Sequence, residues 1–288
     1  MKELSGNKEA KSKKWKLYLW VFITAIATPI FLVLISVIAL RWMDPSATSF
    51  TLREDWGSLE MERYNLREYW VSSDEIPDQV KWAVVASEDQ LFWDHHGFDV
   101  ESIREAWDDR REGRRSRGAS SISQQVAKNL FLSPSQSLLR KGVEAGITVL
   151  IELFWSKERI MEVYLNVAEF GPGIFGIGRA SEVFWSIPAS QINADKAARL
   201  AAVLPSPKRM RVEPPSPYAY ERSRWILRQM TQLTGIQYVQ PTQREPEDTT
   251  DIEPEDIDPF LLQTERELNE LLNTPEDTVS QENSERLN

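Results

Sequence analysis

Hydrophobic and polar positions divide this chain into one long apolar run, a body with helical periodicity and a polar end. The apolar run extends from Leu17 to Leu40 and contains 24 residues without a charge. At about 1.5 Å per residue, a helix of this length crosses a hydrocarbon layer of roughly 30 Å. Trp15 and Trp42 flank the run, where interfacial aromatic residues are common. The pattern therefore predicts a transmembrane helix over residues 17–40.

The charges on either side of this run predict its orientation. Segment 1–16 contains six lysines, whereas only Arg41 follows the run closely. Because positive residues that flank a span remain in the cytoplasm, we expect the N-terminus there and the rest of the chain on the other side. A cleaved signal peptide is the alternative, but its apolar region is usually about 7–15 residues long and ends in small residues. Arg41, Trp42 and Met43 do not resemble such a cleavage site.

The body of the chain has the periodicity of helices. Across residues 79–235, apolar positions recur three and four residues apart, and strand-like alternation is nearly absent. We therefore expect a mainly α-helical domain over residues 70–238. A linker and membrane-proximal region at residues 41–69 is expected to join this domain to the membrane helix.

Composition changes the picture at the end of the chain. The formal charge of the whole chain is −10, yet residues 240–288 alone carry −12, which leaves +2 for the rest. Residues 239–288 are therefore predicted to be an acidic, disordered tail. Within the tail, the leucine-rich stretch 260–272 could form a short amphipathic helix that docks on a partner or on the chain's own body. The chain has no cysteine, which excludes disulfides and thiolate chemistry.

The first candidate for chemistry lies at the end of a predicted helix that Asp78 caps. Val84 and Val85 stand four and three residues before Glu88 and share its side of this helix. A carboxylate at the end of such an apolar run is expected to be partly shielded from water, which suits a general base acting near neutral pH. The alternative is an ordinary exposed glutamate at a helix end.

A second candidate follows a basic loop. Ser121 followed by Gln124 matches a capping box, which places a helix N-terminus at this point. Ser121, Gln125 and Lys128 then lie on one side of the helix, one above the other. The free N–H groups of the helix and this polar stripe together suit a phosphate group. The polar outer face of a surface helix would give a similar pattern.

A third candidate is a carboxylate with two cations. Glu144 lies four residues after Arg140 and three after Lys141, within an otherwise apolar helix. Such a group suits a leaving diphosphate, bound directly or through a divalent metal ion (Mg²⁺ or Mn²⁺) near Glu144. A surface ion pair is the alternative. The adjacent His95 and His96 project differently and do not make a standard zinc site, so no metal ligands are assigned, and no organic cofactor is expected.

Two further stretches complete the helical body. Ser156 is expected to cap a helix that ends before a cluster of four glycines between residues 171 and 178. Such a cluster usually forms a turn, but it also lets a backbone approach a sugar closely. A later helix is stopped by Pro205 and Pro207, and three basic residues follow directly: Lys208, Arg209 and Arg211.

In this order and spacing, the five stretches resemble the five motifs of the family 51 glycosyltransferases, the peptidoglycan glycosyltransferases. The resemblance covers about residues 70–235 and is strongest to the monofunctional biosynthetic peptidoglycan transglycosylases. It implies a mainly α, lysozyme-like glycosyltransferase domain behind a single N-terminal transmembrane helix. The implied activity is the polymerisation of lipid II into β-1,4-linked glycan, with inversion at the donor sugar and release of undecaprenyl diphosphate.

The resemblance also implies roles for particular residues. EDQLFWDHHGFD matches the first motif, in which Glu88 is the general base that deprotonates the 4-hydroxyl of the acceptor sugar. RKGVE matches the third motif and makes Glu144 the second catalytic carboxylate, with Arg140 and Lys141 beside it as substrate-binding cations. The substrate contacts implied by the first two motifs are Asp89, Phe92, His95, Ser121, Gln125 and Lys128.

The implied setting is the cell inner membrane, crossed once, with the N-terminus in the cytoplasm and the catalytic domain in the periplasm. The implied partners are lipid II, the growing glycan chain and membrane lipid. The acidic tail could bind cell-wall or division proteins, and no nucleic acid is expected.

Three positions depart from the family pattern. Ser121 stands where the family usually has threonine, a change that keeps the hydroxyl. Gln136 stands where many relatives carry an arginine thought to hold phosphate, and Arg179 stands where a small residue is common. Because glutamine carries no charge, the affinity of the donor site is expected to differ.

Two other classes of function remain open at this point. A lysozyme-like lytic enzyme would also use a catalytic glutamate, but it would need neither the basic set nor a permanent anchor. A non-catalytic scaffold of the cell-wall machinery would explain the departures at Ser121 and Gln136, with the acidic tail as a docking arm. Retention of both Glu88 and Glu144 argues against the scaffold.

Overall fold

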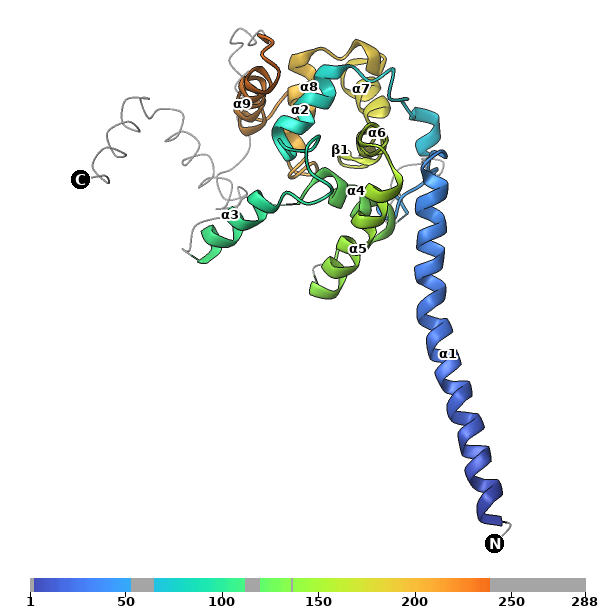
Figure 1. The fold of residues 1–288 in the computed structure, drawn as a ribbon. Coiled ribbons are helices and arrows are strands. Elements are labelled where there is room, and N and C mark those ends of the chain that lie inside the picture. The colour runs from blue at the N-terminus through green and yellow to red at the C-terminus, as the bar shows by residue number, and fades with distance from the viewer. Residues whose placement is uncertain (1–2, 53–64, 112–119, 136, 239–288) are drawn as a thin grey trace, which may run out of the picture. The chain divides into compact units, whose positions relative to one another are not determined.

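The computed structural model describes residues 3–52, 65–111, 120–135 and 137–238 (Figure 1). The acidic tail, with the segment expected to dock, lies outside the described residues. So do Gln136, the basic loop 112–119 and part of the predicted linker.

The described part is mainly helical, which confirms the predicted fold class. A two-stranded antiparallel hairpin, which the periodicity did not predict, is its one sheet among the described residues. The elements are α1 (Glu3–Leu40), η1 (Leu66–Tyr69), α2 (Asp78–Glu88), α3 (Val100–Arg111), α4 (Ile122–Phe131), α5 (Leu138–Phe154), α6 (Lys157–Val167), β1 (Glu169–Gly171), β2 (Ile174–Phe175), α7 (Ile177–Trp185), η2 (Ala189–Gln191), α8 (Ala194–Val203) and α9 (Pro217–Thr234).

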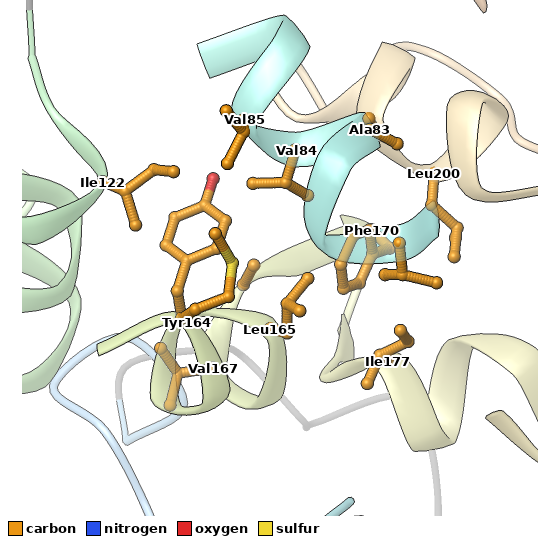
Figure 2. Close-up of a cluster of buried hydrophobic side chains, with 14 of the residues drawn as sticks. Ala83, Val84, Val85, Ile122, Tyr164, Leu165, Val167, Phe170, Ile177 and Leu200 are labelled. Atoms are coloured by element: carbon orange, nitrogen blue, oxygen red, sulfur yellow. The ribbon is translucent and has the colours of Figure 1, made fainter. Parts of the chain in front are cut away.

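The core is built around α6. Helices α2, α8 and α9 pack on one another, and α4 packs on both α5 and α6. Within α6, residues 163–167 are buried on every side, as expected of a helix enclosed by others. Figure 2 shows Tyr164 of α6 pointing toward Val85 of α2 and Ile122 of α4, so this side chain lies where three helices meet.

Side-chain caps fix where several helices begin. Ser121 and Gln124 form the predicted capping box at the start of α4, and Ser156 caps α6 as predicted. The prediction that Asp78 caps α2 is wrong by one position: Pro77 is the N-cap residue, and no side chain caps this helix. Asp78 is instead the first helical residue, where its carboxylate faces the positive end of the helix dipole.

The glycine cluster forms the hairpin turn and lets backbone segments of the protein approach one another. Gly176 has φ +81°, and a Cβ atom added there would lie 2.8 Å from the carbonyl oxygen of Asn166. A Cβ added to Gly178 would lie 2.2 Å from the carbonyl oxygen of Tyr69. Both glycines therefore serve the packing of α7 against α6 and η1. The predicted turn is present, and close approach of a sugar to this backbone stays a prediction.

Helix α1 contains the predicted apolar span. The stretch Tyr18–Leu40 is long and apolar enough to cross a membrane, and an 18-residue window within it has a mean hydropathy of 2.7. Only 6% of this window is buried against the rest of the chain, whereas the core helix of a soluble protein would be mostly buried. The apolar face of the span is therefore not accounted for by contacts within the protein.

Candidate active site

Glu88 ends α2 and meets groups from two other helices. Its carboxylate is half-buried, with 14% of the side chain exposed. Gln125 of α4 donates a hydrogen bond from Nε2 to Glu88 Oε2 at 2.9 Å. Arg222 of α9 places Nη2 4.0 Å from Glu88 Oε1. The expected partial shielding of Glu88 is confirmed, and the alternative of an ordinary exposed side chain is excluded.

The side-chain amide of Gln125 is oriented by Tyr164. The Tyr164 hydroxyl donates to Gln125 Oε1 at 3.2 Å, which leaves Nε2 to face the carboxylate of Glu88. Burial raises the pKa of Tyr164 well above its ordinary value, and the nearby carboxylates of Glu88 and Asp89 raise it further. Tyr164 therefore keeps its proton and remains a hydrogen-bond donor.

Asp89 ties the loop after α2 to the start of α4. Its buried carboxylate accepts a hydrogen bond from the backbone N–H of Ile122 at 3.0 Å and lies 2.8 Å from His95 Nε2. The N–H of Gly97 donates to His95 Nδ1 at 3.1 Å, so the ring proton resides on Nε2 and points at Asp89. The loop is closed by the Ser121 hydroxyl, which donates to the carbonyl oxygen of Gly97 at 2.6 Å.

Four residues that were predicted to bind substrate have a structural role in this loop. Asp89, His95 and Ser121 hold one another's segments in place, and contact of these side chains with substrate stays a prediction. Phe92 differs from the prediction more clearly, because its side chain has no exposed surface. Its ring lies 4.5 Å from Lys157 Nζ, so it supports the loop from within instead of offering a face to a ligand.

Lys128 presents an ammonium group that no described carboxylate pairs with. Its Nζ lies 5.9 Å from the centre of the Phe50 ring. Burial lowers the pKa of Lys128, the carboxylate of Glu144 opposes this, and Arg140 and Lys141 lower it further. Lys128 therefore stands in a cationic surrounding and is suited to take up an anion.

Glu144 joins two of the cations. Arg140 Nη1 lies 2.6 Å from Glu144 Oε2, and Lys141 Nζ contacts Oε1. The Glu144 side chain is only 2% exposed, which confirms the expected burial and excludes a simple surface ion pair. Lys141 also donates to the hydroxyl of Ser120 at 2.9 Å, so it reaches the start of α4. Together with Lys128, three cations gather here around one carboxylate.

The donor set does not fit a metal ion held by the protein. Among the residues that the structure describes, no three histidine or acidic side chains come together. Both oxygens of Glu144 are engaged by Arg140 and Lys141. A divalent ion near Glu144 would have to displace a cation, so no step of the chemistry is assigned to a metal.

Sequence reasoning did not identify two of the groups at this site. Tyr164 was expected only as part of the buried side of its helix, since a tyrosine at an apolar position gives no sign of its hydrogen-bond partner. Arg222 lies in α9, beyond the five motifs, and only the packing of α9 against α2 brings it to Glu88. His96 is exposed and lies outside this network.

Comparisons with known proteins show the family of this chain. The family model described as transglycosylase matches residues 57–231. A biosynthetic peptidoglycan transglycosylase of Xanthomonas euvesicatoria pv. vesicatoria is 47% identical over 213 residues, which cover 73% of this chain and 86% of that protein. A protein of the same name from Pseudomonas aeruginosa is 45% identical over 204 residues, covering 70% of this chain and 88% of that protein. On the match to more than half of its length and on these identities, the chain belongs to the transglycosylase family.

Proposed function

We propose that this protein is a membrane-anchored peptidoglycan glycosyltransferase. It polymerises lipid II into β-1,4-linked glycan and releases undecaprenyl diphosphate. The family match and the names of the relatives support the reaction class. The observation that carries the proposal lies on α4, where Gln125 reaches Glu88 while Lys128, three residues further, offers an ammonium group without a carboxylate partner among the described residues. One helix thus joins a base site to an anion site.

In the proposed reaction, the 4-hydroxyl oxygen of the acceptor sugar attacks the anomeric carbon of the donor. The bond between that carbon and the diphosphate oxygen breaks, and its electron pair leaves with the diphosphate. The hydroxyl proton passes to the carboxylate of Glu88, which acts as the general base. Attack from the face opposite the leaving group inverts the configuration, so no covalent glycosyl–enzyme intermediate is needed.

The surroundings of Glu88 suit this task. Its Oε2 accepts one hydrogen bond from a neutral amide, whereas Arg222 Nη2 lies 4.0 Å from Oε1. A carboxylate that one hydrogen bond holds in position can accept a proton on its other oxygen without losing its orientation.

The leaving diphosphate requires positive charge, which Lys128, Arg140 and Lys141 supply. Such fixed cations stabilise the charge that develops on the leaving group. Glu144 binds two of these cations at contact distance and so holds them in place. We therefore assign to Glu144 the role of second carboxylate, acting through the cations it positions.

The membrane helix gives the site its location. We propose that residues 17–40 cross the cell inner membrane once, with the N-terminus in the cytoplasm and the catalytic domain in the periplasm. The lysines that precede the span support this orientation. Both lipid-linked substrates lie at the same bilayer surface, which is the benefit of an anchor.

The test is polymerisation of purified lipid II by the full chain in detergent and in liposomes. Glycan polymer is expected from the intact protein, and at least about a hundredfold less from Glu88→Gln, which removes the base while keeping the shape of the side chain. The matched control is Glu75→Gln, because Glu75 is exposed and accepts a hydrogen bond from Ser72, outside the site. A folded Glu88→Gln variant that polymerises at the normal rate would remove Glu88 as the base.

The same experiment separates the two alternatives. Release of short fragments from finished glycan, without polymerisation of lipid II, would indicate the lytic enzyme. Absence of both activities in the folded, intact protein would indicate the scaffold. The three cations beside Glu144 disfavour the lytic reaction, because hydrolysis of glycan has no diphosphate leaving group to stabilise.

A further inference from the structure

The end of the membrane helix is held by side chains of the catalytic domain. The last four carbonyl groups of any helix lack partners within the helix. In α1, the turn formed by residues 41–43 satisfies two of them. The other two are satisfied from the junction of α5 and α6: Trp155 Nε1 donates to Val37 O at 2.8 Å, and Arg159 donates to Leu40 O from Nε at 3.2 Å and from Nη2 at 3.0 Å.

Arg159 also bonds residues that follow the end of α1. Its Nη2 donates to Met43 O at 2.9 Å, and its Nη1 lies 2.9 Å from Asp44 Oδ1 and 3.0 Å from Glu162 Oε1. The guanidinium also lies 5.5 Å from the centre of the Trp70 ring. Only 12% of the Arg159 side chain is exposed. A planar fork that bonds two backbone carbonyls and two carboxylates at once has no equivalent in a lysine.

Apolar packing reinforces these bonds at this end of α1. Val37 has no exposed surface, and Val33 and Leu40 pack against the core of the domain. Further toward the N-terminus, the side chains of residues 18–25 and 27–32 are exposed. The domain is therefore fixed to the last two turns of α1. We call Trp155 and Arg159, together with their partners in α1, the anchor socket.

The helix that carries the anchor socket also carries part of the candidate site. Arg159 lies in the first turn of α6, and Tyr164 follows five residues later in the same helix. Tyr164 orients Gln125, which in turn contacts Glu88. A rigid helix thus connects the end of the membrane anchor with the group that orients the proposed base.

We propose that Trp155 and Arg159 are positioning residues that fix the height and tilt of the candidate active site over the bilayer. This inference rests on the proposed function, because it concerns a reaction on lipid-linked substrates. A flexible tether would raise the local concentration of enzyme at the membrane. The anchor socket would also orient the active site relative to the bilayer. Orientation of reacting groups contributes strongly to catalysis on a bound substrate.

The first test compares two substrates for the full chain. The variants are Arg159→Lys, which keeps the charge but loses the fork, and Trp155→Phe, which keeps a ring but loses the donor for Val37. With lipid II in vesicles we expect about a tenfold loss of rate, since a loosened helix end no longer orients the active site toward the bilayer. With a water-soluble lipid II analogue that carries a short lipid chain, we expect a change of less than about twofold, because such a substrate does not depend on the bilayer.

The matched control is Arg199→Lys. Arg199 is similarly shielded, with 19% of its side chain exposed, and it also pairs with two carboxylates, Asp195 and Glu213. It makes no described contact with α1, so its replacement should leave the ratio of vesicle rate to soluble rate unchanged.

The second test needs no substrate. Because the chain has no cysteine, Phe31→Cys on α1 and Gln232→Cys on α9 introduce the only two sites for spin labels. The intact socket should give one narrow distribution of distances between the labels in vesicles, and both socket variants should broaden it. This measurement remains readable even if lipid II is not the substrate, so it separates failure of the socket from failure of the proposed function.

Three results would overturn the proposal. Equal loss of rate on both substrates would mean that Trp155 and Arg159 only stabilise the fold. A distance distribution that stays narrow in both variants would mean that the socket does not position the active site. A broad distribution with an undiminished vesicle rate would mean the same.

Discussion

Gln125 decides how the carboxylate of Glu88 is held. An amide has a donor end and an acceptor end, and only the donor end can face a carboxylate. Tyr164 donates to the acceptor end and so turns the donor end toward Glu88. Because the raised pKa of Tyr164 keeps its hydroxyl protonated, this orientation persists at any pH at which the protein works.

We expect Tyr164→Phe to lower kcat for polymerisation by about fivefold, the factor that corresponds to roughly 1 kcal/mol for one lost hydrogen bond. The ring still fills the core, but Gln125 Oε1 loses its donor and the amide can turn. Steady-state kinetics on lipid II measure the loss, with KM expected to change little. An unchanged kcat in a folded variant would show that Gln125 is oriented by other contacts.

The same tyrosine predicts a response of stability to alkaline pH. Its folded pKa lies well above the ordinary value of 10.0, so above that pH the unfolded chain releases a proton that the folded chain retains. The contribution of Tyr164 to stability is therefore complete below pH 10 and declines as the pH rises further. Urea unfolding across this range should show a steeper alkaline loss for the intact protein than for Tyr164→Phe, and equal slopes would contradict the argument.

Lys128 illustrates a group that serves binding at the expense of stability. Its pKa is lowered chiefly by burial, so between the folded value and the ordinary 10.5 the unfolded chain binds more protons, and stability rises with pH through this window. At neutral pH the buried charge is therefore unfavourable to the fold. We expect Lys128→Met to raise Tm, by about 2–4 °C for each 1 kcal/mol gained in a domain of this size.

The same variant should lose its response to an anion. Inorganic diphosphate is expected to raise Tm of the intact protein, because it binds the folded state, and to have no such effect on Lys128→Met. Lys196→Met serves as the control, since Lys196 lies over the Trp185 ring away from the cationic group. A lower Tm for Lys128→Met, with the diphosphate effect retained, would contradict both expectations.

At the scale of elements, close approach of backbones determines how α7 sits. A Cβ on Gly178 would lie 2.2 Å from the carbonyl oxygen of Tyr69, whereas a Cβ on Gly146 in α5 would meet nothing within 4 Å. The first glycine is required by its neighbour. The second stands in a helix interior without a packing reason.

We therefore expect opposite effects from the same substitution. Gly178→Ala should lower the free energy of unfolding by about 3 kcal/mol, because η1 must move away from α7. Gly146→Ala should raise it by about 0.5–1 kcal/mol, because alanine is the better helix former. Urea unfolding of the two variants measures the difference, and a stabilised Gly178→Ala protein would contradict the assigned packing.

Much of the fold and of the site follows from the sequence, for identifiable reasons. The capping box at Ser121 and the spacing of Glu144 from Arg140 and Lys141 are local, and local chemistry is visible in a single chain. The hairpin and the contact of Arg222 with Glu88 depend on segments far apart in sequence, which no periodicity reports. Phe92 was assigned to substrate through the motif, yet its complete burial depends on how the loop folds back.

At the scale of the whole molecule, charge is divided between two parts of the chain. Residues 240–288 carry −12 and the remaining residues +2, so the acidic end differs in kind from the body that holds the site. Contacts within the chain group residues 1–240 into one unit, and every group discussed at the candidate site belongs to that unit. This grouping predicts that the acidic end is dispensable for the proposed chemistry.

We expect a chain that ends after Tyr238 to polymerise lipid II in vesicles within about twofold of the full-length rate, because anchor, socket and site all precede the cut. Electrostatics add a second expectation, since removal of a −12 segment weakens the repulsion between this protein and an anionic bilayer. The shortened chain should bind vesicles rich in anionic lipid more tightly at low salt, and this gain should vanish at about 1 M salt, where the Debye length is roughly 3 Å. Loss of most activity in a folded, shortened protein would place part of the catalytic machinery in the tail.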